Sequence, residues 1–359
     1  MGSLVDALNA YKGRRILVTG HTGFKGSWLA FWLTQLGAEV YGLSKDVPTE
    51  PSHFKLLKLD ELIHHELVDL RDEQRVLQTF DRIRPEFVFH LAAQATVRRS
   101  YSDPKETFDT NVGGAVNLLE AIRAIDCVRV LVFITSDKCY RNIETTRGYR
   151  EDDSLGGVDP YSCSKASAEH VFSAYHHSFF AHREHLGSAT TRAGNVIGGG
   201  DWAADRIVPD CIRSLRAGSP IRIRSPYATR PWQHVLEPLS GYLMLGARLL
   251  TEPQGFSGPW NFGPSSTASQ PVERVVQKAI QVWGAGDYEV TDQSPHLHES
   301  TLLHLDSTKA MDHLQWHVRW DFDEMLQQTV GWYKSWSSGV DVRTLTASQI
   351  AHYVDKHRD

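Results

Sequence analysis

The sequence predicts an α/β fold in which a parallel sheet carries helices on both faces. Two observations in the first half of the chain lead to this prediction. Short apolar runs alternate with helical runs, and a glycine-rich loop follows the first apolar run. Alternating strands and helices form βαβ units, which place their strands parallel in one sheet. A chain of 359 residues is long enough for such a sheet and a second lobe.

The individual elements follow from apolar spacing and from residues that stop a helix. Apolar side chains recur at helical spacing after the glycine loop, and Pro85 ends a helical run that begins at Glu73. Short runs rich in Val, Ile, Leu and Phe predict buried strands between the helices. The predicted strands are 16–18, 39–43, 67–68, 87–91 and 128–134, and the predicted helices are 24–36, 73–83 and 107–125.

The periodic pattern weakens after about Val196, where Gly198-Gly199-Gly200 and several prolines interrupt it. We therefore predict a dinucleotide-binding domain over residues 1–195, to which part of 231–262 returns. Residues 196–359 are expected to form mainly a smaller, irregular C-terminal lobe that binds substrate.

Composition limits the classes of partner. The chain has 38 Lys plus Arg against 43 Asp plus Glu, and this net charge of -5 argues against nucleic acid. The four cysteines form no C-x-x-C pair, so neither a disulfide framework nor a metal site is predicted. No apolar run approaches the ~18 residues of a membrane span, and the N-terminus lacks a signal core. We expect a cytoplasmic protein without a membrane or metal partner.

Gly20, Gly23 and Gly26 recur every three residues between a predicted strand and a predicted helix. Glycine lets the backbone turn tightly and approach a pyrophosphate, whose charge the helix N-terminus attracts. A purely structural turn is the alternative, but the βαβ context favours a cofactor site. The sheet is therefore predicted to be a Rossmann-type doubly wound sheet that binds a dinucleotide.

The residues after the second strand leave the choice between NAD and NADP open. Ser44 or Asp46 could meet the adenosine ribose, whereas Lys45 could favour a 2′-phosphate. Asp69 ends the next strand, where its carboxylate could meet the adenine amino group or could cap a loop.

Ser136-Asp137-Lys138 follows a predicted strand, and Tyr161 and Lys165 share one face of a predicted helix. An ammonium beside a phenol favours the phenolate, so we expect Lys165 to lower the tyrosine pKa from its usual ~10. Tyr161 could then take a proton from an alcohol, with the Ser136 hydroxyl bonded to the same oxygen. Asp137 and Lys138 add a spare acid and base, which elimination of water needs and simple alcohol oxidation does not.

A lysine that acts as a base must be neutral. Lowering its free pKa of ~10.4 to ~7 costs roughly 4 kcal/mol, which a desolvated site with other positive charges could supply. Otherwise Lys138 would stabilise an enolate while another group takes the proton, and the residues alone leave both roles open. Asp137 must be protonated to act as an acid.

Together these motifs resemble the extended short-chain dehydrogenase/reductase superfamily, and within it the nucleotide-sugar 4,6-dehydratases. Lys138 is the sharper marker, because the dTDP-glucose and GDP-mannose branches carry glutamate at this place and the CDP-glucose branch carries lysine. The resemblance covers most of the chain. It rests on VTGHTGFKGSWL at 18–29, HLAAQ at 90–94, ITSDKCY at 134–140, YSCSK at 161–165, RAGNVIGGGDW at 192–202 and RPWQHVLEPL at 230–239.

The resemblance implies a tightly held NAD, CDP-glucose as the nucleotide-diphosphate sugar, and a homodimer, with further pairing to a tetramer left open. No residue by itself discriminates cytosine from another base. The implied catalytic residues are Ser136, Asp137, Lys138, Tyr161 and Lys165. The implied cofactor-binding residues are Gly20, Thr22, Gly23, Phe24, Lys25, Gly26, Asp69, Leu70, Leu91, Ala92, Ala93, Tyr161 and Lys165.

The implied reaction is an internal redox cycle. Tyr161, with Lys165 and Ser136, removes the proton of the hydroxyl at sugar carbon 4 while NAD takes the hydride. Lys138 is the candidate base at carbon 5, and Asp137 is the candidate acid for the hydroxyl that leaves carbon 6. The hydride then returns to carbon 6, which gives a 4-keto-6-deoxy sugar.

Candidate substrate ligands lie beyond the strand ends and in the second lobe: Gln94, Asn195, Arg206, Arg230, His298 and Glu299. Arginine suits bidentate contacts with phosphate, although each arginine could instead form a structural salt bridge. A nucleotide-sugar 4-epimerase or reductase would use the same tyrosine and lysine without the extra acid and base. A non-catalytic NAD-binding regulator would commonly lack the tyrosine or the lysine, and both are present here.

Overall fold

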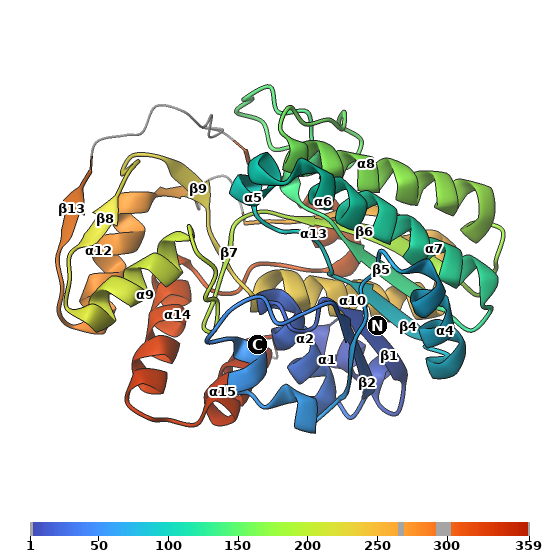
Figure 1. The fold of residues 1–359 in the computed structure, drawn as a ribbon, viewed down its shortest axis with the longest axis horizontal. Helices are drawn as coiled ribbons and strands as arrows, with labels where there is room; N and C mark the ends of the chain where they lie inside the picture. Colours follow the sequence, from blue (N-terminus) through green and yellow to red (C-terminus); the bar gives the residue numbers. More distant parts are fainter. Residues whose placement is uncertain (1–2, 265–268, 292–302, 358–359) are drawn as a thin grey trace.

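The computed structural model describes residues 3–264, 269–291 and 303–357. Its centre is a seven-stranded sheet with the order β11-β6-β5-β4-β1-β2-β3, in which every pairing is parallel (Figure 1). The α/β doubly wound fold predicted from the sequence is confirmed. The strands are β1 Arg15–Thr19, β2 Glu39–Ser44, β3 His64–Leu67, β4 Phe87–His90, β5 Val130–Ile134, β6 Gly187–Ala193 and β11 Gly258–Phe262.

Helices cover both faces because successive strand side chains point to opposite sides of the sheet. Ile16 and Val18 of β1 belong to the apolar core that α2 and α10 complete, whereas Leu17 packs with α4, α7 and α8 in a second core. Burial on both faces explains why the strands are continuous apolar runs. These helices are α2 Phe24–Gln35, α4 Glu73–Ile83, α7 Gly114–Ala124, α8 Pro160–Tyr175 and α10 Leu236–Thr251.

The helix expected over 107–125 has three parts: α6 Pro104–Phe108, a π-helical turn at Asp109–Gly113, and α7. The remaining short helices in this half are α1 Leu4–Leu8, α3 His53–Leu56 and α5 Val97–Ser102. Their few residues show too little periodicity to be predicted. Within the part of the chain that the structure describes, no helix is long and apolar enough to cross a membrane.

The second lobe contains more regular structure than its weak periodicity predicts, and it lies to one side of the sheet (Figure 1). The strand pairs β8–β13 and β7–β10 are parallel, and β9–β12 is antiparallel. These strands have only two or three residues each, which is too few to give a clear pattern in the sequence. The elements of this lobe are α9 Ile207–Ala217, α12 Val272–Trp283, α14 Phe322–Ser337, β7 Val196–Ile197, β8 Ile221–Ile223, β9 Thr229–Pro231, β10 Gln233–His234, β12 Ser269–Pro271 and β13 Tyr288–Val290.

Late segments of the chain pack against the first half. The edge strand β11 pairs with β6, and α15 Val342–Asp355 lies against α2. The short helix α11 Pro253–Phe256, which precedes β11, packs against β6, and α13 Thr308–Leu314 packs against β11. The division of the chain into domains at residues 195 and 196 stays a prediction.

Glu237 of α10 is a fully buried carboxylate that joins several segments. It accepts hydrogen bonds from the backbone N–H groups of Arg319 (3.1 Å) and Trp320 (2.9 Å) and from the Tyr353 hydroxyl of α15 (2.6 Å). Burial raises the pKa of Glu237 to about 7, although these donors act in the opposite direction. The carboxylate thereby ties α15 and the segment after α13 to α10.

Replacing this group, Glu237→Gln, should flatten the pH dependence of stability. Because its pKa is raised in the folded state, Glu237 contributes stability that is present below the unfolded value of ~4.3 and is lost as the pH rises through about 7. Between about pH 4 and about pH 8, the wild type should lose ~3 kcal/mol more unfolding free energy than the variant. Urea unfolding across this range measures the difference, and parallel curves would contradict it. Arg319 faces the same carboxylate and is present in both proteins.

Candidate active site

The glycine loop lies at the carboxyl end of β1, where two close backbone approaches require glycine. Gly20 has φ +76°, and a Cβ built on it would lie 2.7 Å from the backbone N of Ala92. A Cβ on Gly26 would lie 2.1 Å from the carbonyl oxygen of Gly20. The loop therefore packs tightly against the end of β4, and α2 begins beside it with Gly23 as its N-cap.

Side chains at the strand ends hold the loop in place. The Thr22 hydroxyl donates to the backbone carbonyl of Asp46 at 2.7 Å, which joins the loop to the residues after β2. Thr19 lies 2.8 Å from Nδ1 of His90, and its hydroxyl accepts the N–H of Ala92 at 3.2 Å. Leu91, Ala92 and Ala93 follow β4 in the chain and therefore lie directly beside the glycine loop.

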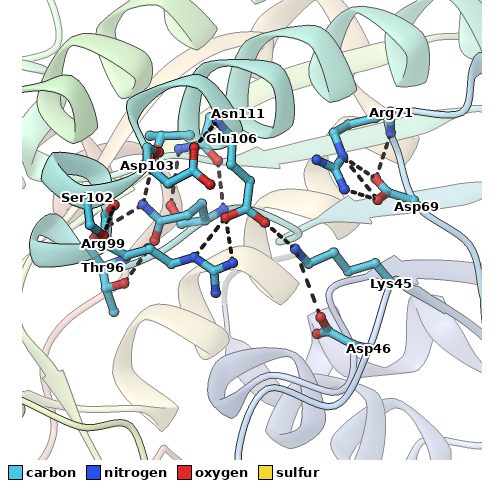
Figure 2. Close-up of polar contacts among 12 residues, drawn as sticks. Lys45, Asp46, Asp69, Arg71, Thr96, Arg99, Ser102, Asp103, Glu106 and Asn111 are labelled. Atoms are coloured by element: carbon cyan, nitrogen blue, oxygen red, sulfur yellow. Dashed lines mark hydrogen bonds and ion pairs between the residues drawn. The ribbon is translucent and has the colours of Figure 1, made fainter.

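Figure 2 shows the charged residues after β2 and β3 and the helices near them. Lys45 donates to Glu106 of α6 at 2.7 Å, and Asp69 accepts two hydrogen bonds from the Arg71 guanidinium. Hydrogen bonds from Arg71 lower the pKa of Asp69, so this carboxyl is ionised. Asp69 therefore closes a local turn in this structure, which matches the loop-capping alternative. Leu70 follows it in the core against α7.

The Ser136-Asp137-Lys138 segment forms a short 3-10 turn directly after β5. The Ser136 hydroxyl donates to Asp137 Oδ1 at 2.9 Å, and the Asp137 side chain is almost fully buried. Burial raises the pKa of Asp137, while the charges of Lys138 and Lys25 act to lower it. A buried carboxyl with a raised pKa is suited to hold a proton that it later donates.

Tyr161 and Lys165 lie in the first two turns of α8, beside the turn after β5, and both side chains are buried. Lys165 Nζ lies 5.9 Å from the centre of the Tyr161 ring. Burial raises the pKa of Tyr161 to about 12, although a hydrogen bond with Ser136 acts to lower it, and burial lowers the pKa of Lys165 to about 8. The expectation that the tyrosine pKa falls is therefore wrong here, because desolvation by burial outweighs the Ser136 hydrogen bond and the Arg206 charge, which act to lower it.

Lys25 of α2 contributes another ammonium to the same site. Its pKa is lowered to about 8 by burial and by the charges of Lys165 and Arg206, while Asp137 acts in the opposite direction. Cationic side chains from the glycine loop, α8 and the second lobe thus converge near one buried carboxyl. Such a site favours anions, including a diphosphate or a developing enolate.

Behind the catalytic turn lies a buried ion pair between Arg192 of β6 and Glu169 of α8, each side chain 3% exposed. Arg192 Nε and Nη2 donate to the carboxylate at 3.0 and 2.8 Å, and the Thr190 hydroxyl donates at 2.9 Å. Thr135, which precedes Ser136, donates to the same carboxylate. The guanidinium also donates to the Tyr140 hydroxyl at 2.7 Å.

The predicted substrate ligands have different positions. Arg206 lies near Tyr161 and is paired with Asp201 at 2.9 Å, so its structural salt bridge is present. Gln94 is buried and donates to the Thr107 hydroxyl at 3.0 Å, which leaves its amide committed to the protein. Arg230 lies on β9 and donates to the carbonyl of Thr229 at 2.8 Å.

Asn195 follows β6, and its backbone carbonyl accepts the N–H of Gln233 at 3.2 Å. His298 and Glu299 lie outside the described residues. Within the described ranges, no group of His, Cys, Asp or Glu could hold a metal ion.

Sequence reasoning did not assign a role to Glu169 or Arg192. Glu169 follows Lys165 by four residues, as Lys165 follows Tyr161, so helical spacing could have placed it on the catalytic face of α8. Arg192 is the charged residue of a fully buried strand, and such a residue requires a buried partner.

Known proteins resemble the chain along most of its length. A family model described as GDP-mannose 4,6 dehydratase matches residues 17–253. The CDP-glucose 4,6-dehydratase of Salmonella typhimurium is 47% identical over 350 residues, which cover 96% of this chain and 98% of that relative. The dTDP-glucose 4,6-dehydratase of Xanthomonas campestris pv. campestris is 26% identical, over 90% of this chain and 95% of that protein.

A solved structure has the same architecture. The UDP-glucose 4-epimerase of Thermus thermophilus, in complex with NAD, superposes with a TM-score of 0.75 at 26% identity. The match covers 89% of this chain and 99% of that chain. The fold that the two chains share therefore carries more than one reaction on nucleotide sugars. The match to residues 17–253 and the 47% identical relative show that the chain belongs to the GDP-mannose 4,6 dehydratase family.

Proposed function

We propose that this chain is an NAD-dependent hydro-lyase that removes water from CDP-glucose and forms CDP-4-keto-6-deoxyglucose. The observation that supports dehydration is the buried Asp137 beside Lys138, on a turn next to Tyr161 and Lys165. An epimerase or reductase needs the tyrosine and lysine but no further acid and base. The choice of CDP-glucose rests on the relative that is 47% identical.

The residues present fit a dinucleotide. The backbone at Gly20 and Gly26 packs so closely against neighbouring backbone that neither position has room for a side chain. The N-terminus of α2 lies beside these glycines, and a helix N-terminus in such a loop can bind a pyrophosphate. Gly20, Thr22, Gly23, Phe24, Lys25, Gly26, Asp69, Leu70, Leu91, Ala92 and Ala93 would surround this cofactor. When bound, NAD supplies reversible hydride transfer, first from carbon 4 and then to carbon 6 of the sugar.

Tyr161 is proposed to hold the hydroxyl of sugar carbon 4 and to take its proton, with Ser136 bonded to the same oxygen. Burial favours the neutral phenol, so the phenolate needs positive charge nearby. Lys165 and Lys25 bring ammonium groups to the site. Burial lowers the pKa of each to about 8, so both are still mainly protonated at neutral pH.

Asp137 is proposed to donate a proton to the hydroxyl that leaves carbon 6, since burial already favours its protonated form. Lys138 is proposed to take the proton of carbon 5, which becomes acidic once carbon 4 is a ketone, and to return a proton to carbon 5 when hydride reaches carbon 6. Arg206, Arg230, Asn195, Gln94, His298 and Glu299 are proposed to lie around the sugar or diphosphate. We further propose a cytoplasmic homodimer.

Product analysis tests the function directly. Mass spectrometry after incubation with CDP-glucose should show loss of one water without net formation of NADH. Parallel incubations with dTDP-glucose, UDP-glucose and GDP-mannose should give far less product. Tyr161→Phe should lower turnover by about 10²- to 10⁴-fold. An unchanged mass with a new stereoisomer would instead assign the chain to the epimerases.

Variants of the acid and the base should separate the two proton transfers. Asp137→Asn keeps the base, so solvent deuterium should still enter carbon 5 while dehydration falls by about 10²- to 10⁴-fold. Lys138→Met should lose both deuterium exchange and dehydration. Lys138→Arg keeps the positive charge, but arginine does not deprotonate in proteins, so it should lose exchange too.

Retained exchange in Lys138→Arg would contradict the base role and would assign Lys138 to stabilising the enolate. Lys105→Met is the matched control, because Lys105 is an exposed lysine paired with Asp109. This control should keep wild-type exchange and turnover.

Removing one partner of the buried ion pair should destabilise the protein. Arg192→Met leaves Glu169 buried without its cation, which should lower the unfolding free energy by about 3–5 kcal/mol. The double variant with Glu169→Gln should recover part of this loss. Arg222→Met is the matched control, because the pair of Arg222 with Glu289 is exposed and should contribute less than ~1 kcal/mol. Denaturant unfolding measures these changes, and equal losses for the two arginines would contradict the expectation.

A further inference from the structure

Lys45 directly follows β2, at the place where Rossmann folds recognise the adenosine ribose. The usual acidic residue that bonds the ribose 2′-hydroxyl is replaced here by Ser44. The Ser44 hydroxyl lies 3.0 Å from Nδ1 of His21, so it is engaged within the protein. Lys45 follows it, and a free cation here would suit the 2′-phosphate of NADP.

Lys45 is not free of partners, because α6 presents a carboxylate to it. Its ammonium donates to Glu106 Oε1 at 2.7 Å and lies 4.0 Å from Asp46 (Figure 2). The other oxygen of Glu106 accepts hydrogen bonds from Arg99 of α5, with Nε at 2.8 Å and Nη2 at 2.5 Å. The Glu106 side chain is only 11% exposed, and its pKa is lowered by Lys45 and Arg99.

The start of α6 explains why Glu106 points toward these cations. Asp103 is the N-cap, and its carboxylate accepts the N–H of Glu106 at 2.9 Å. In a capping box, a glutamate at this position would reach back to the N–H of the N-cap residue. Here that N–H already donates to the carbonyl of Arg99 at 2.8 Å. The Glu106 carboxylate is therefore available to bind Lys45 and Arg99.

The charges around Lys45 balance without a ligand. Two cations, Lys45 and Arg99, face two carboxylates, Glu106 and Asp46. A ribose hydroxyl can enter such a neutral network, but a 2′-phosphate adds up to two negative charges beside the carboxylates. The ion pair of Asp69 with Arg71 adds no free cation, and the charges of Lys45 and Glu106 act on it from nearby (Figure 2).

We propose that Glu106 makes this site select NAD over NADP, by holding the lysine that would otherwise bind a 2′-phosphate. The acidic determinant thus comes from α6 instead of the end of β2. The inference rests on the proposed use of NAD and names the residue that sets this preference.

Binding measurements on the purified protein test the inference without relying on turnover. Isothermal titration gives the dissociation constants of NAD and NADP for the wild type, Glu106→Gln and the double variant Glu106→Gln/Lys45→Met. Glu106→Gln should shift the ratio of the two constants toward NADP by about tenfold, and Lys45→Met should abolish this gain. Higher salt should reduce the gain, because it depends on charge.

Two further proteins make the test decisive. Lys45→Met alone should not raise NADP binding relative to NAD, because it leaves Glu106 and Asp46 in place with one cation fewer. Glu120→Gln is the matched control, since Glu120 pairs with Arg123 on α7 and should not affect the ratio.

An unchanged ratio in a folded Glu106→Gln protein that still binds NAD would overturn the inference alone. A gain that survives the loss of Lys45 would also overturn it, and so would a shift of the ratio toward NADP in Lys45→Met alone. Failure of the wild type to bind either nucleotide would overturn the proposed cofactor as well.

Discussion

The buried pair of Arg192 and Glu169 connects β6 with α8 and with the segment after β5, and these last two carry the proposed catalytic side chains. Removing two charges from water is costly unless the surrounding groups satisfy them completely. Here the Glu169 carboxylate accepts from Arg192 and from two threonine hydroxyls, and the guanidinium also donates to Tyr140 and to the Glu151 carbonyl. Because these partners come from β6, α8 and the segment that follows β5, the pair fixes their relative positions.

The ion pair of Arg192 and Glu169 lies close enough to Lys165 to affect the protonation of that lysine. Tyr161, Lys165 and Glu169 are spaced four residues apart on α8, so the ion pair begins one turn beyond the catalytic lysine. Burial disfavours charge on both Lys165 and Tyr161, while the Glu169 charge acts to keep Lys165 protonated. Arg192 neutralises most of the Glu169 charge. The proton on Lys165 is thus less strongly held than it would be beside an unpaired carboxylate.

Much of the fold could be predicted because its strands are buried on both faces. The helix at Glu73–Ile83 has the predicted bounds, since Asp72 caps its start and Pro85 follows its end. The second lobe was less predictable, because strands of two or three residues give no periodicity. Likewise, the sequence places Lys45 at the end of β2 but cannot show that Glu106, 61 positions further on, lies within hydrogen-bond distance. Contacts between distant residues depend on packing and not on local pattern.

A UDP-glucose 4-epimerase shares the fold of this chain, so the fold alone does not set the reaction. Under the proposed function, the residues specific to dehydration are Asp137 and Lys138, which lie in one short turn after β5. The Asp137 carboxylate fits because residue 194 is glycine: a Cβ there would lie 3.0 Å from Asp137 Oδ2. A larger residue at 194 would push the carboxyl away from the end of β6. The position of the Asp137 carboxyl after β5, which the proposed function uses as the acid, therefore depends on a small residue after β6.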